Sequence, residues 1–219
     1  MRSVILNFHG IGPILRQVDD AERTCWLDLE QFEAVLDLVR NQPHVFLTFD
    51  DGNISDVDLA LPVLLHKRLT ATFFVCTGRL GRPTFLGREH VRHLQAQGMR
   101  IGSHGVAHRT WRRLSLHEVT AELYKSRQAL EDICGMPVLE AACPFGAYDR
   151  VVLRALQSAG YQKVYTSDGG WTTSSSWLQA RNTVLRSHSI NDVARLVRCR
   201  PHRLARMVSW SRRLLKQCR

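Results

Sequence analysis

Short apolar runs alternate along this chain with segments that have the periodicity of helices. The runs that should form strands lie at residues 3–9, 45–49, 70–76, 99–103, 138–143, 161–166 and 183–185. Helical patterns separate most of them, at residues 27–40, 57–68, 88–97, 115–134 and 149–159. Strands that alternate with helices pair in parallel, so the pattern predicts an α/β fold with a parallel sheet. At this chain length we expect the sheet to close into a barrel.

The size and composition fit one globular domain. The chain has 219 residues, of which 44% are hydrophobic and 23% are charged, and these values exclude a disordered or fibrous protein. No apolar run approaches the roughly 18 residues that cross a bilayer. The first apolar run is shorter than a signal-peptide core, and the six cysteines form no Cys-x-x-Cys pair. We therefore expect a cytoplasmic protein with reduced thiols.

The positive charge is concentrated at the C-terminal end. The net charge is +10, but residues 195–219 hold nine basic residues and no acidic ones, which leaves residues 1–194 with 21 basic and 20 acidic residues. This distribution predicts a nearly neutral barrel domain, residues 1–190, followed by a basic amphipathic helical tail, residues 191–219.

Two interpretations of this tail stay open. Its apolar residues alternate with basic ones as in an amphipathic helix, which is typical of binding to an anionic membrane surface. The same pattern fits a helix that packs on the barrel with its cationic side in water. Binding through residues 195–219 would place the protein at the inner face of the membrane. Nucleic acid is not expected as a partner, because the excess charge is confined to the tail.

Two groups of polar residues follow predicted strands. Thr48-Phe49-Asp50-Asp51-Gly52 ends one strand with adjacent carboxylates, although a tight turn alone would also account for Asp-Asp-Gly. His104 and His108 follow another strand. They can bind one ion if the segment between them forms a helical turn, and they would also fit a pair of surface histidines. Taken together, Asp, His and His from two strand ends match a catalytic zinc site with an open position.

These motifs make the sequence similar to the polysaccharide deacetylases of carbohydrate esterase family 4. Residues 48–52 match the first motif of that family, and His104 and His108 match the spacing of its second motif. Gly105 replaces the small hydroxyl residue that usually follows the first histidine. Ala142-Cys143-Pro144-Phe145-Gly146 stands where the family often has Arg-x-Pro-Tyr-Gly, so the arginine that orients the catalytic carboxylate is absent. The resemblance covers residues 1–190 and implies a distorted parallel (β/α)7-type barrel.

The resemblance implies a metal-dependent hydrolase that removes N-acetyl groups from an amino-sugar-containing glycan or a lipid-linked sugar. Asp51, His104 and His108 would bind a divalent ion, with zinc expected before cobalt or nickel. The ion would lower the pKa of its bound water, and Asp50 would take the proton of that water as general base. Two other hypotheses are kept: a hydrolase of another non-peptide C–N bond on the same fold, and a carbohydrate-binding domain whose catalytic site has lapsed.

The third motif and one later arginine are expected to complete the substrate site. Pro144, Phe145 and Gly146 would contact the substrate, with a backbone N–H near Phe145 against the oxyanion. Arg181 is grouped with them, because a bidentate guanidinium at the barrel mouth would replace the missing arginine. A solvated arginine on a loop is the alternative.

Two histidines are candidates for the general acid that protonates the leaving amine. His9 follows the first predicted strand and resembles the opening histidine of a branch that acts on exopolysaccharides. His188 lies where many members carry a Leu-x-His motif, although the spacing here is longer by one residue. We favour His9, because that branch also lacks the arginine that is missing here. Either histidine would also fit an ordinary hydrogen-bonded loop residue.

Overall fold

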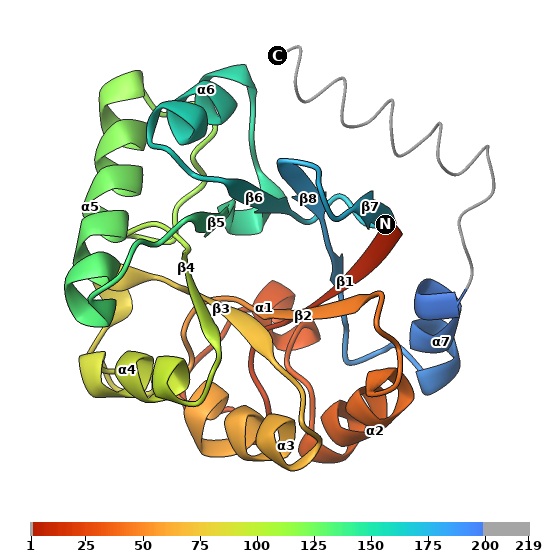
Figure 1. The fold of residues 1–219 in the computed structure, drawn as a ribbon. Helices are drawn as coiled ribbons and strands as arrows, with labels where there is room; N and C mark the ends of the chain where they lie inside the picture. Colours follow the sequence, from red (N-terminus) through yellow and green to blue (C-terminus); the bar gives the residue numbers. More distant parts are fainter. Residues whose placement is uncertain (1, 199–219) are drawn as a thin grey trace.

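Strands and helices alternate along the chain, as the sequence predicts (Figure 1). The computed structural model describes residues 2–198. The strands are β1 (Arg2–Phe8), β2 (Val45–Phe49), β3 (Ala71–Val75), β4 (Arg100–Ser103), β5 (Glu140–Ala142), β6 (Lys163–Thr166), β7 (Trp171–Thr173), β8 (Leu178–Ala180) and β9 (Asn182–Thr183). The helices are α1 (Asp20–Thr24), α2 (Leu29–Val39), α3 (Leu61–His66), α4 (Arg88–Ala96), α5 (Leu116–Cys134), α6 (Arg150–Ser158) and α7 (Ile190–Arg198). Short helical segments η1 (Asp56–Ala60), η2 (Thr77–Arg79) and η3 (Pro144–Gly146) follow β2, β3 and β5.

The strands form one sheet that curls into a nearly closed barrel. Strands β1 to β6 pair in parallel in chain order, and β8 pairs in parallel with β6. β9 returns to pair in parallel with β1, and only Arg181 separates it from β8, so one bent segment completes the circle. β7 pairs antiparallel with β1. The expected parallel α/β barrel is confirmed, and its helices lie around the outside (Figure 1).

Apolar side chains pack on both faces of the sheet. Outside the barrel, the main core joins the strands to α2, α3, α4 and α7. The ring of Phe49 stacks there on Phe8 and Phe73, with centroids 5.2 and 4.6 Å away. Neighbouring residues of a strand face opposite sides, so Phe74 points inward and packs 4.8 Å from the ring of Tyr165. A second core lies under α5 and α6.

Some elements differ from the expectation for physical reasons. The helix expected at residues 57–68 is divided into the π-type turn η1 and α3. Pro62 lies in the first turn of α3, because a proline has no backbone N–H and is tolerated only there. The sequence does not predict α1, β7 and β8, since elements of three to five residues are too short to show a periodic pattern.

Helix α5 has the predicted boundaries. The side chain of Ser115 accepts a hydrogen bond from the backbone N–H of Glu118, and the Glu118 carboxylate accepts one from the backbone N–H of Ser115. Gly135 ends the helix in the left-handed region at a φ of 66°. The same helix also holds the loop that carries the two histidines.

The expected C-terminal tail is described only in part. Residues 191–198 belong to α7, whose Val193 and Val197 side chains are buried in the main core beside α2. Residues 199–219 lie outside the described residues, so the division of the chain at residue 190 stays a prediction. Within residues 2–198, no helix combines the length and the apolar character that a membrane span requires.

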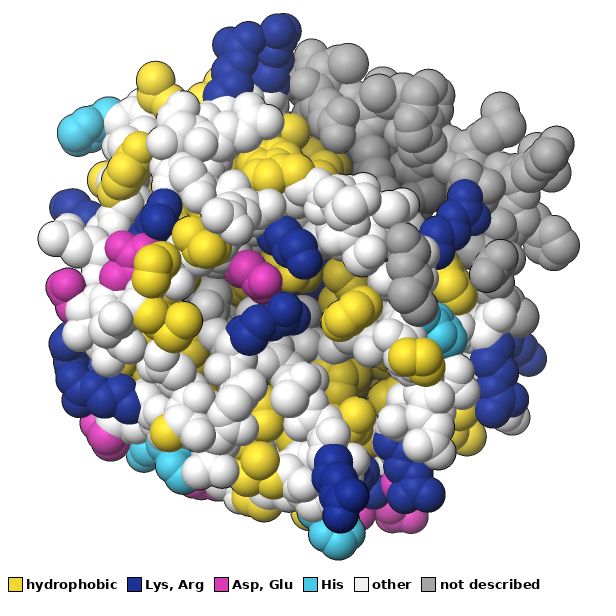
Figure 2. Space-filling view, in the orientation of Figure 1, with side chains coloured by type: hydrophobic (Ala, Val, Ile, Leu, Met, Phe, Trp, Pro, Cys, Tyr) yellow, Lys and Arg dark blue, Asp and Glu magenta, His cyan; other side chains and the backbone are white. Residues whose placement is uncertain are grey.

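Basic side chains are spread over the face of the molecule shown in Figure 2. Lys and Arg lie there in several separate groups, with Asp, Glu and hydrophobic side chains between them. This arrangement agrees with the balance of 21 basic and 20 acidic residues in residues 1–194.

Candidate functional site

The two adjacent aspartates point in different directions. Both follow β2, and Asp51 has a left-handed φ of 79°, followed by Gly52 at 72°. This turn leaves Asp50 facing Arg181 inside the barrel, whereas Asp51 faces His108 on the loop after β4. Both carboxylates are buried. The backbone conformation therefore gives two neighbouring carboxylates separate environments.

Asp51, His104 and His108 converge at the carboxyl ends of β2 and β4. His108 Nε2 lies 2.9 Å from Asp51 Oδ1, and His104 Nε2 lies 3.7 Å from the same oxygen. One ligand atom from each residue lies within 4.8 Å of the others. His104 Nδ1 lies 2.9 Å from the carbonyl oxygen of Ala142, which fixes the ring with its Nε2 toward Asp51.

This set of donors fits a divalent cation. One carboxylate oxygen and two imidazole nitrogens are ligands that zinc takes in catalytic sites. Burial lowers the pKa of His104 to about 4, so its imidazole is neutral at neutral pH and can bind a metal. Burial alone would raise the pKa of Asp51, but the neighbouring histidines, His108 first, hold that pKa below its usual range. Asp51 therefore offers an ionised oxygen.

The two histidines come together without a helical turn between them. The segment is an irregular loop, in which Gly105 and His108 have φ values of 77° and 50°. Glu122 of α5 holds this loop. One of its carboxylate oxygens accepts hydrogen bonds from the backbone N–H of Val106 at 2.7 Å and of Ala107 at 3.1 Å. A Cβ atom at position 105 would lie 2.9 Å from that oxygen, so glycine suits both the space and the φ.

Glu122 is a candidate that the sequence motifs do not reveal. It lies on the buried face of α5 with Val119, Leu123 and Ser126. An acidic residue within an apolar stripe is rarely buried without a partner. The position of Glu122 in such a stripe is therefore the one feature of the sequence that could have revealed it.

Arg181 forms a bidentate ion pair with Asp50. Its two terminal nitrogens each lie 2.7 Å from one carboxylate oxygen, and Asn7 donates a further hydrogen bond at 3.0 Å. Burial alone would raise the pKa of Asp50. The positive charge of Arg181 is the main cause that lowers this pKa instead, to about 2. Arg181 has 0% exposed surface and lies over the rings of Phe74 and Tyr165. Arg181 therefore positions the carboxylate of Asp50. Because Arg181 itself is fully buried, the structure argues against its expected contact with substrate.

The two candidate general acids lie in different surroundings. His9, directly after β1, is close enough to Asp50 and Asp51 to lower the pKa of both carboxyls. Its Nδ1 makes no hydrogen bond to the residues that the structure describes. His188 Nδ1 accepts a hydrogen bond from the backbone N–H of Leu185 at 3.2 Å, and its carbonyl oxygen accepts one from Gln31 of α2. Phe8 and Phe49 pair in register, so His9 and Asp50 follow neighbouring strand ends, whereas His188 has its partners at Leu185 and on α2.

The third motif forms η3 at the end of β5. Pro144 and Gly146 are buried, whereas the side chain of Phe145 is 69% exposed. The Phe145 ring lies 4.7 Å from the ring of His108, between centroids. Phe145 has a φ of 58°, which turns its side chain outward beside the candidate metal ligands. Of the three residues expected to bind substrate, Phe145 alone presents a large exposed surface.

The family is decided by comparison with known sequences. Residues 38–164, more than half of the chain, match the polysaccharide deacetylase family. This chain belongs to the polysaccharide deacetylase family. A chitooligosaccharide deacetylase from Azorhizobium caulinodans is 27% identical over 130 residues, which are 58% of this chain and 60% of that protein. A chitooligosaccharide deacetylase from a Bradyrhizobium strain is 30% identical over 125 residues, which are 56% of this chain and 55% of that protein.

Solved structures share the fold of this polysaccharide deacetylase family member. The deacetylase PplD of Streptococcus pyogenes, in complex with acetate, has a TM-score of 0.78 and 20% identity, and the match covers 90% of this chain and 98% of that one. IcaB from Ammonifex degensii has a TM-score of 0.71 and 20% identity, covering 90% of this chain and 97% of that one. At this identity the likeness shows the fold alone. This chain spans about half the length of the curated relatives that it matches.

Proposed function

We propose that this chain is a metal-dependent hydrolase that removes N-acetyl groups from an amino sugar. The observation that supports the proposal most is the convergence of Asp51, His104 and His108 beside Asp50, a second carboxylate held separately. Burying ionised groups costs free energy of folding. A protein that only binds carbohydrate would therefore gain nothing from keeping two carboxylates and two histidines buried side by side. Family membership and the curated relatives named as deacetylases support the same reaction.

Two residues of this chain would carry out the proton transfers of the reaction, one as general base and one as general acid. A divalent metal held by the Asp–His–His set would supply the Lewis acid that polarises the acetamide carbonyl and activates water. Asp50 would accept the proton of the attacking water as general base, with Arg181 holding its carboxylate ionised and oriented. His9 would donate a proton to the amine as the C–N bond breaks. Acetate and a free amino sugar would then leave.

The experiment that tests this function measures acetate release. The full chain is loaded with zinc, and N-acetylated chitooligosaccharide is the substrate. We expect acetate release that chelation abolishes and that zinc, or more weakly cobalt or nickel, restores. His104→Ala should lose bound metal and activity together, whereas Asp50→Asn should keep the metal and lose activity by at least about a hundredfold. Metal binding without acetate release from any glycan would support the carbohydrate-binding alternative.

A second candidate reaction is hydrolysis of another non-peptide C–N bond. The metal ligands and Asp50 would serve any amide carbonyl, and the fold does not separate the two reactions. A panel of acetamide, formamide and urea compounds without a sugar tests this alternative. Turnover of a sugar-free compound at a higher kcat/KM than the N-acetylated sugar would contradict the deacetylase proposal.

We propose His9 as the general acid. Its place near both carboxylates supports the choice, since a proton donor must be within reach of the bond that breaks. His9→Ala should lower kcat by about a hundredfold or more with bound metal unchanged. His188→Ala should leave kcat within about twofold, because its ring caps a loop beside α7. Loss of activity in the second variant alone would contradict the assignment.

We also propose that the protein is cytoplasmic and that the basic residues 199–219 bring it to an anionic membrane surface. The sequence pattern of these residues supports this, because they supply seven of the ten excess positive charges of the chain. The full chain and a chain that ends at Arg198 are compared by flotation with anionic and with neutral liposomes. Flotation of the full chain alone, with anionic liposomes alone, is expected. Equal behaviour of the two chains would contradict the proposal.

A further inference from the structure

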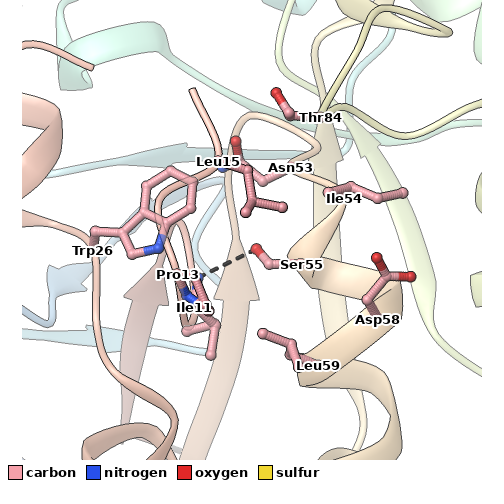
Figure 3. Close-up of a pocket in the computed structure, with 10 residues that line it drawn as sticks. All are labelled: Ile11, Pro13, Leu15, Trp26, Asn53, Ile54, Ser55, Asp58, Leu59 and Thr84. Atoms are coloured by element: carbon pink, nitrogen blue, oxygen red, sulfur yellow. Dashed lines mark hydrogen bonds between the residues drawn. The ribbon is translucent and has the colours of Figure 1, made fainter. Parts of the chain in front are cut away.

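A cavity of about 220 Å³ lies beside the candidate site (Figure 3). Its walls come from the loops after β1, β2 and β3, so it opens at the same end of the barrel as Asp51. The walls are mainly apolar, with Trp26 on one side and Leu59 on the other, and Leu15 at the edge (Figure 3). The side chain of Leu15 is 66% exposed. An apolar hollow of this kind next to a polar site suits a ligand that has both characters.

Two arginines and one aromatic ring connect this cavity with the candidate metal ligands. Arg79 Nη1 lies 3.3 Å from Asp51 Oδ1, and the Arg79 guanidinium lies 5.1 Å from the centroid of the Phe85 ring. The guanidinium of Arg16 lies 4.7 Å from the same ring and 5.6 Å from the ring of Trp26, which lines the cavity. The contacts form an unbroken path from Asp51 to the cavity wall.

The two arginines differ in the partners that they already have. Arg16 is neutralised by an ion pair with Glu22 and also donates a hydrogen bond to Asn53 at 3.0 Å. Within residues 2–198, Arg79 forms an ion pair with Asp51 alone, and its Nη1 makes no hydrogen bond there. A cation bound by the Asp–His–His set would take up the charge of Asp51. The half-buried guanidinium of Arg79 would then need another anion.

We propose that Arg79 and this cavity form a subsite for a prenyl phosphate to which the amino sugar is attached. The phosphate lies at Arg79, the first part of the prenyl chain passes along Phe85 and Arg16, and the next part fills the cavity between Trp26 and Leu59. The rest of the chain passes over the exposed side chain of Leu15. The inference deepens the proposed function and rests on it. A neutral glycan would leave Arg79 without an anion and the cavity without an apolar group.

Binding of farnesyl phosphate to the full, zinc-loaded chain tests the subsite without catalysis. Calorimetry compares farnesyl phosphate with farnesol and with inorganic phosphate, and we expect farnesyl phosphate to bind at least about tenfold more tightly than either. Leu15→Asp and Arg79→Gln should each weaken farnesyl phosphate binding about tenfold. Leu116→Asp, at an equally exposed leucine on α5, is the control and should leave it unchanged. Equal binding of farnesol and farnesyl phosphate would overturn the role of Arg79, and unchanged binding in Leu15→Asp would overturn that of the cavity.

Acetate release separates this inference from the proposed function. The substrates are N-acetylglucosamine linked through phosphate to farnesol and the methyl glycoside of N-acetylglucosamine. We expect kcat/KM to be at least about tenfold higher for the prenyl-linked substrate, and Leu15→Asp to reduce that ratio. Equal kcat/KM for the two substrates would overturn the inference and leave the deacetylase proposal standing. Acetate from neither substrate would overturn the deacetylase proposal, while farnesyl phosphate binding would still decide on the subsite.

Discussion

An arginine and an aspartate that are buried together depend on each other. Arg181 has 0% exposed surface, and its guanidinium donates to Asp50, Asn7 and the carbonyl oxygen of Thr166. Asp50 in turn receives both of its strongest hydrogen bonds from Arg181. Since both charges are buried, removing one partner leaves the other without its counter-charge in a medium of low dielectric constant.

Replacing Arg181 should therefore destabilise the fold as well as the site. Arg181→Met is expected to lower the free energy of unfolding by about 3–5 kcal/mol, because Asp50 is left buried and unpaired. Adding Asp50→Asn removes that charge, so the double variant should be more stable than Arg181→Met alone. Urea unfolding of the two single variants and the double variant measures this coupling. Simple addition of the two single effects would show that the pair is not coupled.

Asp56 is a buried carboxyl outside the proposed mechanism. Neither of its side-chain oxygens makes a hydrogen bond to the described residues. Burial, together with the charges of Asp51 and Asp50, raises its pKa well above the usual range. In the unfolded chain the same carboxyl ionises at its ordinary pKa. The folded state is therefore disfavoured progressively as the pH rises above that ordinary value, until the folded carboxyl also ionises.

Asp56→Asn should remove this pH dependence. Asparagine carries no charge at any pH, so the variant should gain stability relative to the natural chain as the pH rises from about 4 to about 8. Each pH unit between the two pKa values is worth about 1.4 kcal/mol. Urea unfolding of the metal-free proteins at both pH values measures the difference. A constant difference between the two proteins would show that Asp56 ionises in the folded state as it does in water.

At the scale of the element, α5 acts as the support of the histidine loop. Its N-terminus is capped by Ser115, and two turns later the Glu122 carboxylate accepts hydrogen bonds from two backbone N–H groups of the loop between His104 and His108. The loop contains left-handed residues at positions 105 and 108, which cost free energy unless other contacts hold them. The position of His108 therefore depends on a helix that carries no ligand itself.

Glu122→Ala is expected to weaken metal binding. Without an acceptor for the two N–H groups the loop loosens, and zinc affinity should fall by about 10- to 100-fold. Glu122→Gln retains an oxygen acceptor and should recover part of that loss. Ser115→Ala, on the same helix, should cost about 1 kcal/mol of stability through the lost cap and leave zinc affinity unchanged. Competition with a chromophoric chelator measures the affinities, and equal affinity in Glu122→Ala and the natural chain would contradict the supporting role.

At the scale of the whole molecule, the end of the described chain helps to close the barrel. The segment from β8 to β9 joins β6 to β1 (Figure 1). Arg181, which lies in this segment, is fully buried over the rings of Phe74 and Tyr165. α7 then packs on α2, and the side chain of Gln31 donates a hydrogen bond to the carbonyl oxygen of His188 at 2.8 Å. The buried side chains of α7 thus pack against the barrel, although its Arg195 and Arg198 resemble the later basic residues in sequence.

Two truncated chains should differ in stability. A chain that ends at Ser189 loses Val193 and Val197, both with 0% exposure, and should be less stable by about 3–6 kcal/mol. A chain that ends at Arg198 keeps both valines and should unfold at nearly the urea concentration of the full chain. Circular dichroism during urea unfolding measures the midpoints. Equal midpoints for the two truncated chains would show that α7 contributes nothing to the core.

Local pattern was enough to predict the barrel, the long helix α5 and the strand ends at which the candidate metal ligands meet. Strand and helix periodicity depends on neighbouring residues, and the capping box of Ser115 and Glu118 lies within one turn. The motif residues Asp51, His104 and His108 follow predicted strands, and the ends of parallel strands meet at one rim of a barrel. These features could be predicted because each depends on contacts between residues close together in the sequence or on a general rule of barrel topology.

Contacts between distant segments were decided by the tertiary structure alone. The sequence determined an α/β barrel with two carboxylates and two histidines at strand ends. It did not show that Glu122 holds the histidine loop, that Arg79 faces Asp51, or that Arg181 lies fully buried behind Asp50. Arg181 and Asp50 are 131 residues apart. Such partners leave no periodic signal in the sequence, because closure of the barrel brings them together and the low dielectric of its interior makes their pairing necessary.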